Sequence, residues 1–498
     1  MMLALLSSVA LLVPQPQDAA PPNPLAVSEP EAEVRLSLQQ ALDMALQRDL
    51  GLQMEELSAE VARFNYEGSW GAFDPVFNAQ ASVTDTDFEI QSSIFGSQEV
   101  NETTVFGEAG VLFPVRTGGS FEVKANSSNK ETNEPFQGLS RSTTDNIELS
   151  FNQPLLRGAG SSYAESTQRE ADLEFRRQLE SLDVSRQALL ANVENAYWDL
   201  VSALRQVAVA EESLSVSREQ LEQNRRRLEA GVGTQVEVLQ SEADEAIKVE
   251  QHLLRDVELS DAQDMLKGFL QPGTDSLAWS AQIVPITPLP EVDLSGVPEW
   301  RAAVVTALEH RPDLRRDRVQ IDIAEEQLTR ARSERKARLD LNLSTRGYGF
   351  DSSSSAALSS AAEFEFPTHV AALTFSLPIG NRSASSAERS ARASLRSARL
   401  AYDAQESKVV EEVRGAVRRI NYAAEAIAAT SKSADLAQEQ LQAEQARYRE
   451  GLSTNFQVLQ FAEQLSTAQF NLTQAQTLFA KARVTLDQHL GTLGNDLP

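Results

Sequence analysis

Two stretches of this chain are near copies of one another. The first runs from Arg227 to Gln240 as RLEAGVGTQVEVLQ, and the second runs from Arg447 to Gln460 as RYREGLSTNFQVLQ. They lie 220 residues apart and align without a gap, with six of fourteen positions identical. In each, a helical pattern stops at a glycine and a new one starts after a threonine. This order predicts a tight helix–turn–helix, so we expect a duplicated chain with a hairpin tip in each half.

The helix before each tip is predicted to be very long. From Leu189 to Leu228, large apolar residues recur every seven positions, and a second register of mostly small residues lies between them. The same two registers recur 220 residues later, up to Tyr448. Small residues between large ones let neighbouring helices approach closely. A helix over 161–229 would be about 100 Å long, which no compact domain requires.

Between the first helix and the long helix of each half, apolar and polar residues alternate. Phe77, Ala79, Ala81 and Val83 occupy odd positions, with polar residues between them. This alternation predicts strands with one apolar and one polar face. Similar segments lie at 105–113, 121–125, 147–151, 339–343 and 371–377. The serine-rich stretch over 351–360 is expected to be a loop.

These patterns divide the chain into two repeats and two connecting segments. The first repeat, 34–271, contains a helix, strands over 75–152, the long helix 161–229, the tip 231–234 and a return helix over 235–270. The second repeat, 300–491, contains a helix, strands over 339–378, the long helix 383–449, the tip 451–454 and a return helix over 455–490. Residues 272–299 form a proline-rich linker, or equatorial segment. Residues 1–20 are expected to be a signal peptide and spacer, or alternatively a disordered tail.

Composition excludes several classes of function. The net charge of −27 argues against a nucleic-acid partner, and the absence of cysteine excludes disulfides and thiolate metal sites. The four histidines show no paired spacing, so neither a metal site nor a cofactor is expected. No nucleophile elbow, phosphate loop or paired-carboxylate site is present, so we expect no catalytic residues and no enzyme activity. After the first segment, no run of 18 apolar residues predicts a membrane-spanning helix.

The predicted strands and helices both need partner copies. An open sheet edge is intolerable in lipid, and a single long hairpin would leave its apolar stripe in water. One oligomer satisfies both requirements, with a barrel of pooled strands continued by a cylinder of pooled helices. The alternative is a soluble rod with a small β cap.

The chain resembles the TolC-like outer membrane efflux protein family over essentially its whole length after the first segment. Besides the two tips, the resemblance rests on Arg311-Pro312-Asp313-Leu314, on the segment from Gln153 to Gly158, and on its partner Leu377-Pro378-Ile379-Gly380. It implies an α+β membrane protein: a homotrimer with a twelve-stranded outer-membrane β-barrel, four strands per copy, on a long periplasmic α-barrel of helical hairpins. It also implies a passive exit duct for small-molecule efflux or type I protein secretion. Such ducts meet a periplasmic adaptor (membrane fusion) protein and an inner-membrane transporter.

The resemblance also implies roles for the tips. Residues that would meet the adaptor are Gly231, Val232, Gly233 and Thr234 in the first tip and Gly451, Leu452, Ser453 and Thr454 in the second. In the family, an aspartate before Val-Leu lies at the narrow periplasmic entrance. Here Glu237 and Gln457 occupy that position, and Gln460 stands where a further aspartate can occur. The resemblance therefore implies a gate of Glu237, Tyr448, Gln457 and Gln460 without an acidic ring from the second repeat. Glu242 could compensate, and these residues could alternatively be ordinary coiled-coil surface.

The first half has an additional hairpin, from Val105 to Ala125, that the resemblance does not account for. It could lengthen the strands, add strands to the barrel or fold as a cap. A rival for the whole chain is a trimeric coiled-coil structural or adhesive surface protein. That class predicts one barrel-forming block, whereas here strands are expected in both halves and helices return through tips.

Overall fold

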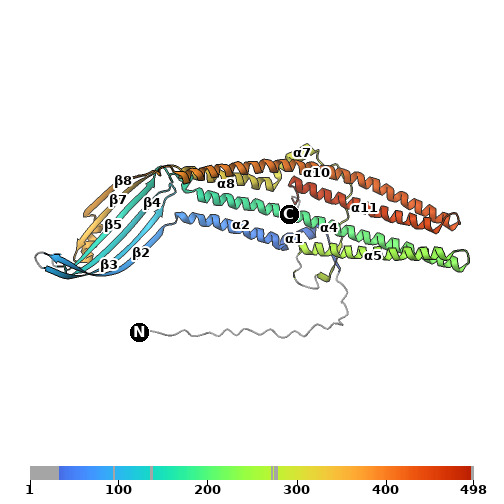
Figure 1. The fold of residues 1–498 in the computed structure, drawn as a ribbon, viewed down its shortest axis with the longest axis horizontal. Helices are drawn as coiled ribbons and strands as arrows, with labels where there is room; N and C mark the ends of the chain where they lie inside the picture. The colour runs from blue at the N-terminus through green and yellow to red at the C-terminus, as the bar shows by residue number, and fades with distance from the viewer. Residues whose placement is uncertain (1–32, 93–95, 135–137, 271–272, 274–278, 495–498) are drawn as a thin grey trace, which may run out of the picture.

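The computed structural model describes residues 33–92, 96–134, 138–270, 273 and 279–494, so the expected signal peptide lies outside the described residues. The molecule is elongated, with a β-sheet at one end and two helical hairpins at the other (Figure 1). The two hairpin turns lie side by side at the end farthest from the sheet (Figure 1). The predicted strands and the two predicted tips therefore lie at opposite ends of the molecule.

The sheet contains six antiparallel strands in one continuous layer, ordered β2-β3-β4-β5-β7-β8. Their bounds are β2 (Val76–Ser92), β3 (Gly96–Pro114), β4 (Ser120–Thr132), β5 (Arg141–Pro154), β7 (Arg338–Asp351) and β8 (Phe366–Ser376). The four strands per copy that the family resemblance implies are therefore wrong for this chain. The additional hairpin adds two strands, β3 and β4, to the same sheet.

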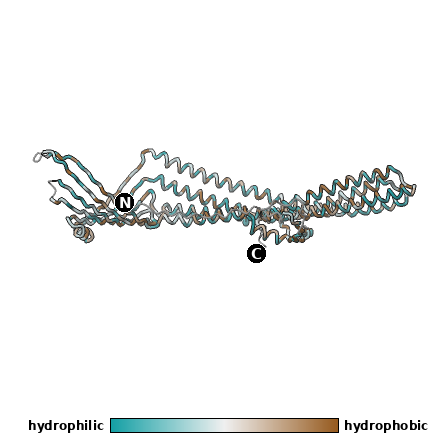
Figure 2. Tube along the Cα trace, turned by 90° about the horizontal axis from the view of Figure 1, so that it is seen from below, coloured by the Kyte–Doolittle hydropathy of each residue, from teal (hydrophilic) through white to brown (hydrophobic). Residues whose placement is uncertain are grey.

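In the half of the sheet near the helices, the two faces differ in polarity, as the alternation predicts; farther out, the odd positions of β2 and β3 carry acidic and polar residues. In every strand pair, odd-numbered residues lie opposite odd-numbered residues, so the whole sheet has one odd face and one even face. Near the helices the odd face carries Phe77, Phe121 and Phe151, whereas the even face carries side chains such as Asn152 and Lys124. In Figure 2, the trace changes repeatedly between teal and brown along these strands.

The sequence predicts a loop for the serine-rich stretch, and this prediction is wrong. The stretch contains helix α9 (Ser354–Ala362). This helix packs on the odd face of β7, where Gly347 and Gly349 leave room for its backbone. A Cβ at Gly349 would lie 1.8 Å from the carbonyl oxygen of Ala357. The small residues of the stretch, rather than any periodicity, permit this close packing.

The two helices predicted before the first tip are each interrupted once, at Asp49 and at Glu165. The helices of the first repeat are α1 (Leu38–Arg48), α2 (Leu50–Ser69), the short 3-10 helix η1 (Trp70–Phe73), α3 (Ser161–Ala164), α4 (Ser166–Glu229) and α5 (Gln235–Leu270). The helix expected from residue 34 is preceded by strand β1 (Glu33–Leu36) and broken at Asp49. The Asp49 side chain accepts a hydrogen bond from the backbone N–H of Leu52 and so caps α2.

The second repeat follows the same plan with fewer strands. Its helices are α7 (Trp300–His310), α8 (Pro312–Glu334), α10 (Arg382–Arg449) and α11 (Asn455–Leu490), besides α9. Pro312 occupies the first turn of α8, where its missing N–H leaves no backbone hydrogen bond unmade. None of the described helices combines the length and hydrophobicity that a membrane-spanning helix requires.

The middle of the molecule is held by a core that links the two halves. Strand β6 (Gln282–Pro285), in the linker, pairs in parallel with β1. The buried Tyr197 of α4 donates a hydrogen bond to the Leu36 carbonyl and accepts one from the Thr287 N–H, each at 3.0 Å. One α4 residue therefore ties the linker to the start of the first repeat.

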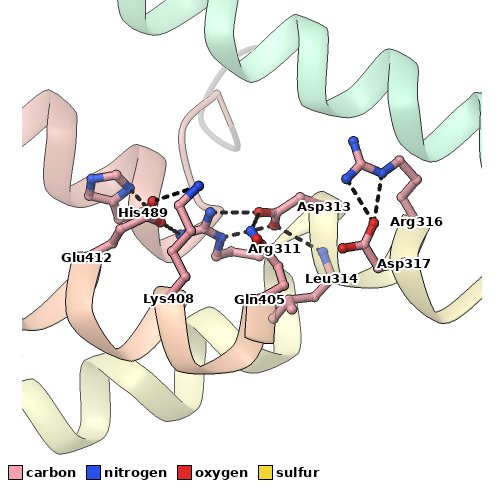
Figure 3. A network of polar contacts seen from close by, with 9 residues as sticks. All are labelled: Arg311, Asp313, Leu314, Arg316, Asp317, Gln405, Lys408, Glu412 and His489. Atoms are coloured by element: carbon pink, nitrogen blue, oxygen red, sulfur yellow. Dashed lines mark hydrogen bonds and ion pairs between the residues drawn. The ribbon is translucent and has the colours of Figure 1, made fainter. Parts of the chain in front are cut away.

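A second polar network lies at the α7–α8 junction (Figure 3). The Arg311 guanidinium lies between two carboxylates, 2.7 Å from Asp313 and 2.6 Å from Glu412 on α10. Burial alone would raise the pKa of Asp313, but the hydrogen bond and charge of Arg311 lower it. Burial also lowers the pKa of the neighbouring His489, which favours its neutral form. The Arg-Pro-Asp-Leu motif therefore joins α8 to the long helix of its own repeat.

Candidate functional site

Each tip is a tight turn closed by backbone hydrogen bonds. Gly231 and Gly451 adopt φ values of 75° and 76°, a left-handed conformation that glycine adopts without strain. The N–H groups of Val232 and Leu452 return to carbonyls near the ends of α4 and α10, at 3.0 and 2.9 Å. This is the pattern of a helix terminated by a left-handed glycine. Both turns form as the sequence predicts.

The next helix at each tip begins with a capping box. The Thr234 N–H donates to the Glu237 carboxylate at 2.8 Å, and the Glu237 N–H donates to the Thr234 hydroxyl at 3.3 Å. Thr454 and Gln457 make the equivalent pair at 3.4 and 3.3 Å. The acid of the first tip and the amide of the second therefore have the same local role. The charge differs, and Gln457 in addition accepts a hydrogen bond from the Ser453 hydroxyl at 3.0 Å.

The turns present apolar side chains to the outside. Val232 is 68% exposed and Leu452 is 70% exposed, and both lie between a glycine and the capping threonine. Gly233 lies close to its own helix, because a Cβ there would approach the Leu228 nitrogen to 2.9 Å. In the second tip, the Ser453 side chain instead hydrogen-bonds to Glu444. Two unlike turns thus present a similar apolar residue.

Behind the turns, a buried polar network joins the two hairpins. Asn224 of α4 and Asn455 of α11 are each 1% exposed. The Asn224 amide donates to the Asn455 side-chain oxygen at 2.8 Å and to the Ser241 hydroxyl at 2.7 Å. Gln220 donates to the same Asn455 oxygen at 3.0 Å, and the Asn455 amide donates to the Glu237 carbonyl at 3.3 Å. We call Gln220, Asn224, Ser241, Asn455 and Tyr448 the tip network.

Tyr448 completes this network from α10. Its hydroxyl donates a hydrogen bond to the Asn224 side-chain oxygen at 2.7 Å. Burial, together with the nearby charge of Glu237, raises the pKa of Tyr448, so the hydroxyl stays protonated and able to donate. The Arg227 guanidinium lies over the same ring, 4.9 Å from its centre. The ring and the hydroxyl thus both contact the first hairpin.

Charged residues surround the network without entering it. Glu242, considered from the sequence as a compensating acid, pairs with Arg225 at 2.9 Å within the first hairpin. The buried Lys248 pairs with Glu463 and so joins α5 to α11. Gln460 is exposed, and no contact of its side chain bears on the network. Of the four gate residues suggested by the resemblance, Tyr448 alone contributes its side chain to the tip network.

Sequence reasoning did not identify four of the five network residues. Asn224 occupies a position of the small-residue register of α4, where polar residues are rare and specify a helix partner. An asparagine in this register could have indicated a buried polar contact with another helix. Asn455 gave none, because its burial depends on α4 lying beside the start of α11.

Chemically, the site is suited to holding two hairpins together. Among the described residues, no group of three or more His, Asp or Glu side chains is arranged to hold a metal ion. The tip network consists of neutral donors and acceptors that satisfy one another across the two repeats. Separating the hairpins would leave buried polar groups without partners, at a cost of about 1–3 kcal/mol for each. The network therefore acts against separation of the two hairpins.

Comparisons with known proteins agree with this arrangement. A family model described as "Outer membrane efflux protein" matches residues 112–267 and 303–492. Proteases secretion protein PrtF of Dickeya chrysanthemi is 25% identical over 420 residues, which cover 82% of this chain and 86% of that protein.

Solved structures with the same fold include two bacterial channels. The outer membrane protein VceC of Vibrio cholerae has a TM-score of 0.66 and 17% identity, covering 91% of this chain and 96% of its own. The open-state MtrE outer membrane channel of Neisseria gonorrhoeae has a TM-score of 0.64 and 18% identity, covering 92% of this chain and 89% of its own.

Proposed function

The chain belongs to the outer membrane efflux protein family, and from this premise we propose that three copies form one passive export duct. The family relationship makes the chain an outer-membrane channel for efflux or secretion, with its helices extending into the periplasm. The family consists of channels, and no catalytic step is part of the proposal.

The observation that carries the proposal is the open, two-faced sheet at the end of long helices (Figure 1). The edge strands β2 and β8 have no partner on their outer sides among the described strands. In a membrane, unpaired backbone groups each cost several kcal/mol, so such a sheet requires closure by further copies. In the half of the sheet near the helices, the odd face then meets lipid and the even face lines water.

At the opposite end, we propose that the exposed turns contact a periplasmic adaptor. Val232 and Leu452 offer one apolar side chain from each repeat, and three copies would present six such turns. The adaptor in turn would connect the duct to an inner-membrane transporter that supplies energy. Because the duct is passive, the transporter would determine which cargo is exported.

We propose that the tip network keeps the periplasmic entrance closed. Its hydrogen bonds join the first hairpin to the second, and movement of the hairpins apart would break them. Glu237 lies near the start of α5, and Gln457 and Gln460 lie near the start of α11, so they would contribute to the electrostatics of the entrance. Gln457 and Gln460 carry no charge, so the proposed gate has acid from the first repeat only.

The test is conductance in a planar lipid bilayer. Purified trimer should open water-filled channels with discrete steps, and native mass measurement should give three copies. A stable trimer that leaves the bilayer silent would favour the rival, a coiled-coil adhesive or structural protein. A monomer that neither conducts nor assembles in lipid would contradict the duct itself.

A further inference from the structure

We propose that the outer-membrane barrel of this protein closes from eighteen strands, which are three copies of the six-stranded sheet, rather than from twelve. This inference rests on the trimer of the proposed function. It concerns the added hairpin, β3 and β4, which lies between β2 and β5 in the sheet. The alternatives are that the hairpin covers the barrel as a cap, or leaves the barrel wall in the assembly.

The pairing of the hairpin with its neighbours argues against a cap. Strand β2 pairs with β3 from Val76 to Ser92, and β4 pairs with β5 from Ser120 to Glu131. Both ladders are antiparallel and continuous. Removing the hairpin from the wall would break both ladders along most of their length.

The inner turn of the hairpin is built into the junction between sheet and helices. Gly118 approaches Gly158 so closely that a Cβ would lie 2.3 Å from its carbonyl oxygen. The Thr117 hydroxyl lies 2.7 Å from the Gln153 side-chain oxygen. The backbone carbonyl of Thr117 accepts a hydrogen bond from the Gly160 N–H at 3.0 Å. The turn is therefore fitted to the segment that leads into the long helix.

An arginine extends this junction to the other side of the hairpin. The Arg116 guanidinium lies over the ring of Trp70 in η1, 4.7 Å from the ring centre, and 3.9 Å from Glu165 before α4. Trp70 belongs to the segment that precedes β2, and Glu165 belongs to the segment that follows β5. The turn thus occupies the space between the two chain segments that a four-stranded sheet would place side by side.

Near the helices, from Val105 to Phe113 and from Phe121 to Ala125, the odd face of the hairpin has the polarity of a lipid-facing wall. Phe113 of β3 and Phe121 of β4 lie opposite each other, with ring centres 6.2 Å apart. They continue a row near the helical end that includes Phe151 on β5. Aromatic residues gather at the membrane interfaces of transmembrane barrels. A cap in water would not require this row.

The even face of the hairpin has the polarity of a water-facing wall. Lys124 of β4 pairs with Glu108 of β3 at 2.9 Å and lies opposite Glu148 of β5. Glu148 in turn pairs with Arg346 of β7 at 2.9 Å. Charges of alternating sign therefore cross four strands without a break at the hairpin. Both faces place β3 and β4 in the same wall as their neighbours.

The sheet edges fit a second copy of this chain. Strand β2 runs away from the helices over 17 residues, and β8 runs back toward them over 11 residues. Copies placed side by side around an axis would pair them antiparallel. Both edges carry apolar odd residues near the helices, Phe77 on β2 and Leu373 and Phe375 on β8. Pairing odd with odd positions extends the lipid-facing side without interruption.

The strand number sets the width of the outlet. With strands about 4.8 Å apart and tilted by about 40°, eighteen strands give a backbone diameter of about 36 Å, against about 24 Å for twelve. Barrels of 16–18 strands leave an aqueous channel. The outlet would therefore impose no constriction, and the selecting part of the duct would lie among the helices.

The direct test is electron microscopy of the full chain in lipid nanodiscs, with strands counted in the barrel wall. Eighteen strands support the proposal. A trimer whose barrel has twelve strands overturns it and leaves the proposed function intact, whereas an assembly that is not a trimer contradicts the proposed function itself. A variant lacking residues 96–132 should form a twelve-stranded barrel about two thirds as wide.

Disulfide trapping gives an independent measurement, because the chain contains no cysteine. Ala371→Cys on β8, combined with Ala79→Cys or Ala81→Cys on β2, should crosslink neighbouring copies into species of twice and three times the chain mass. The matched control, Ala372→Cys with the same partners, places the thiols on opposite faces and should not crosslink. If Ala81→Cys instead crosslinks to Ile147→Cys within one copy, β2 lies beside β5 and the eighteen-stranded arrangement is wrong.

Discussion

Tyr448 and Asn224 are separated by 224 residues in sequence, yet the Tyr448 hydroxyl donates a hydrogen bond of 2.7 Å to the Asn224 side chain. This bond joins α10 of the second repeat to α4 of the first. It is one of several polar contacts between the two hairpins, together with those of Asn224 and Gln220 to Asn455. Its position just behind both turns makes it the contact most sensitive to movement of the hairpins.

Removing this hydroxyl should favour opening. Tyr448→Phe retains the ring beneath Arg227 but loses one hydrogen bond, which contributes about 1 kcal/mol net. That energy changes an opening equilibrium about fivefold. Because the proposed trimer contains three such bonds, single-channel recording should show the open fraction increased by at least this factor. Tyr422→Phe, at an exposed position of the same helix, is the control. Equal open fractions in the two variants would show that the tip network does not keep the entrance closed.

Replacing the acid of the first tip should change charge without changing the fold. Gln457 shows that an amide can complete the capping box, so Glu237→Gln should retain α5 and the trimer. If Glu237 faces the entrance, the potassium-to-chloride permeability ratio should fall, because up to three negative charges are removed. Reversal potentials in a salt gradient measure this ratio. Glu211→Gln, on the exposed surface of α4, should leave it unchanged. An unaltered ratio in Glu237→Gln would place this carboxylate away from the ion path.

The exposed turns should be the points of adaptor contact. A photo-crosslinking residue at Leu452 should yield an adduct with a periplasmic protein in living cells. The same residue at Leu400, which is comparably exposed on α10 but far from the turns, is the matched control. Mass spectrometry of the adduct would identify the adaptor. Adducts of equal yield from both positions would count against a specific role of the tip.

Stability should depend on pH through Asp313. Folding lowers the pKa of this carboxyl, so its ionised form stabilises the folded state above the ordinary value of about 4. The stabilisation is lost as the pH falls toward the lowered value. Asp313→Asn should therefore reduce the free energy of unfolding by about 2 kcal/mol at neutral pH and by progressively less as the pH falls below about 4.

Thermal melts in detergent at pH 7 and pH 3 measure this difference. Asp264→Asn, whose carboxylate is largely exposed beside Lys267, is the control and should change stability by less than about 0.5 kcal/mol. A loss for Asp313→Asn that is equal at both pH values would mean that the effect does not arise from the charge of Asp313.

Local chemistry explains why much of the fold could be predicted. The glycines and threonines of the tips act within a few residues, so both turns and their caps form as expected. The alternation of the strands also acts locally, and its parity correctly assigns one apolar and one polar face to the half of the sheet near the helices. Farther along β2 the odd positions carry Asp85, Asp87 and Glu89, so the prediction fails there. The break at Asp49 was missed because a side-chain cap outweighed the periodic pattern. The helix α9 was missed because it is stabilised by packing against Gly347 and Gly349, which no local pattern indicates.

The sequence by itself determined the duplication, the two hairpins, the turns and the polarity of the strands near the helices, because these depend on neighbours along the chain. Only the tertiary structure decided that the added hairpin enters the sheet between β2 and β5, since strand order depends on which backbone edges meet. It also decided that Asn224 and Asn455 are buried together, because their contact requires two helices from different repeats to lie side by side. Pairings over hundreds of residues leave no periodic trace in the sequence, and the number of strands and the tip network both arise from such pairings.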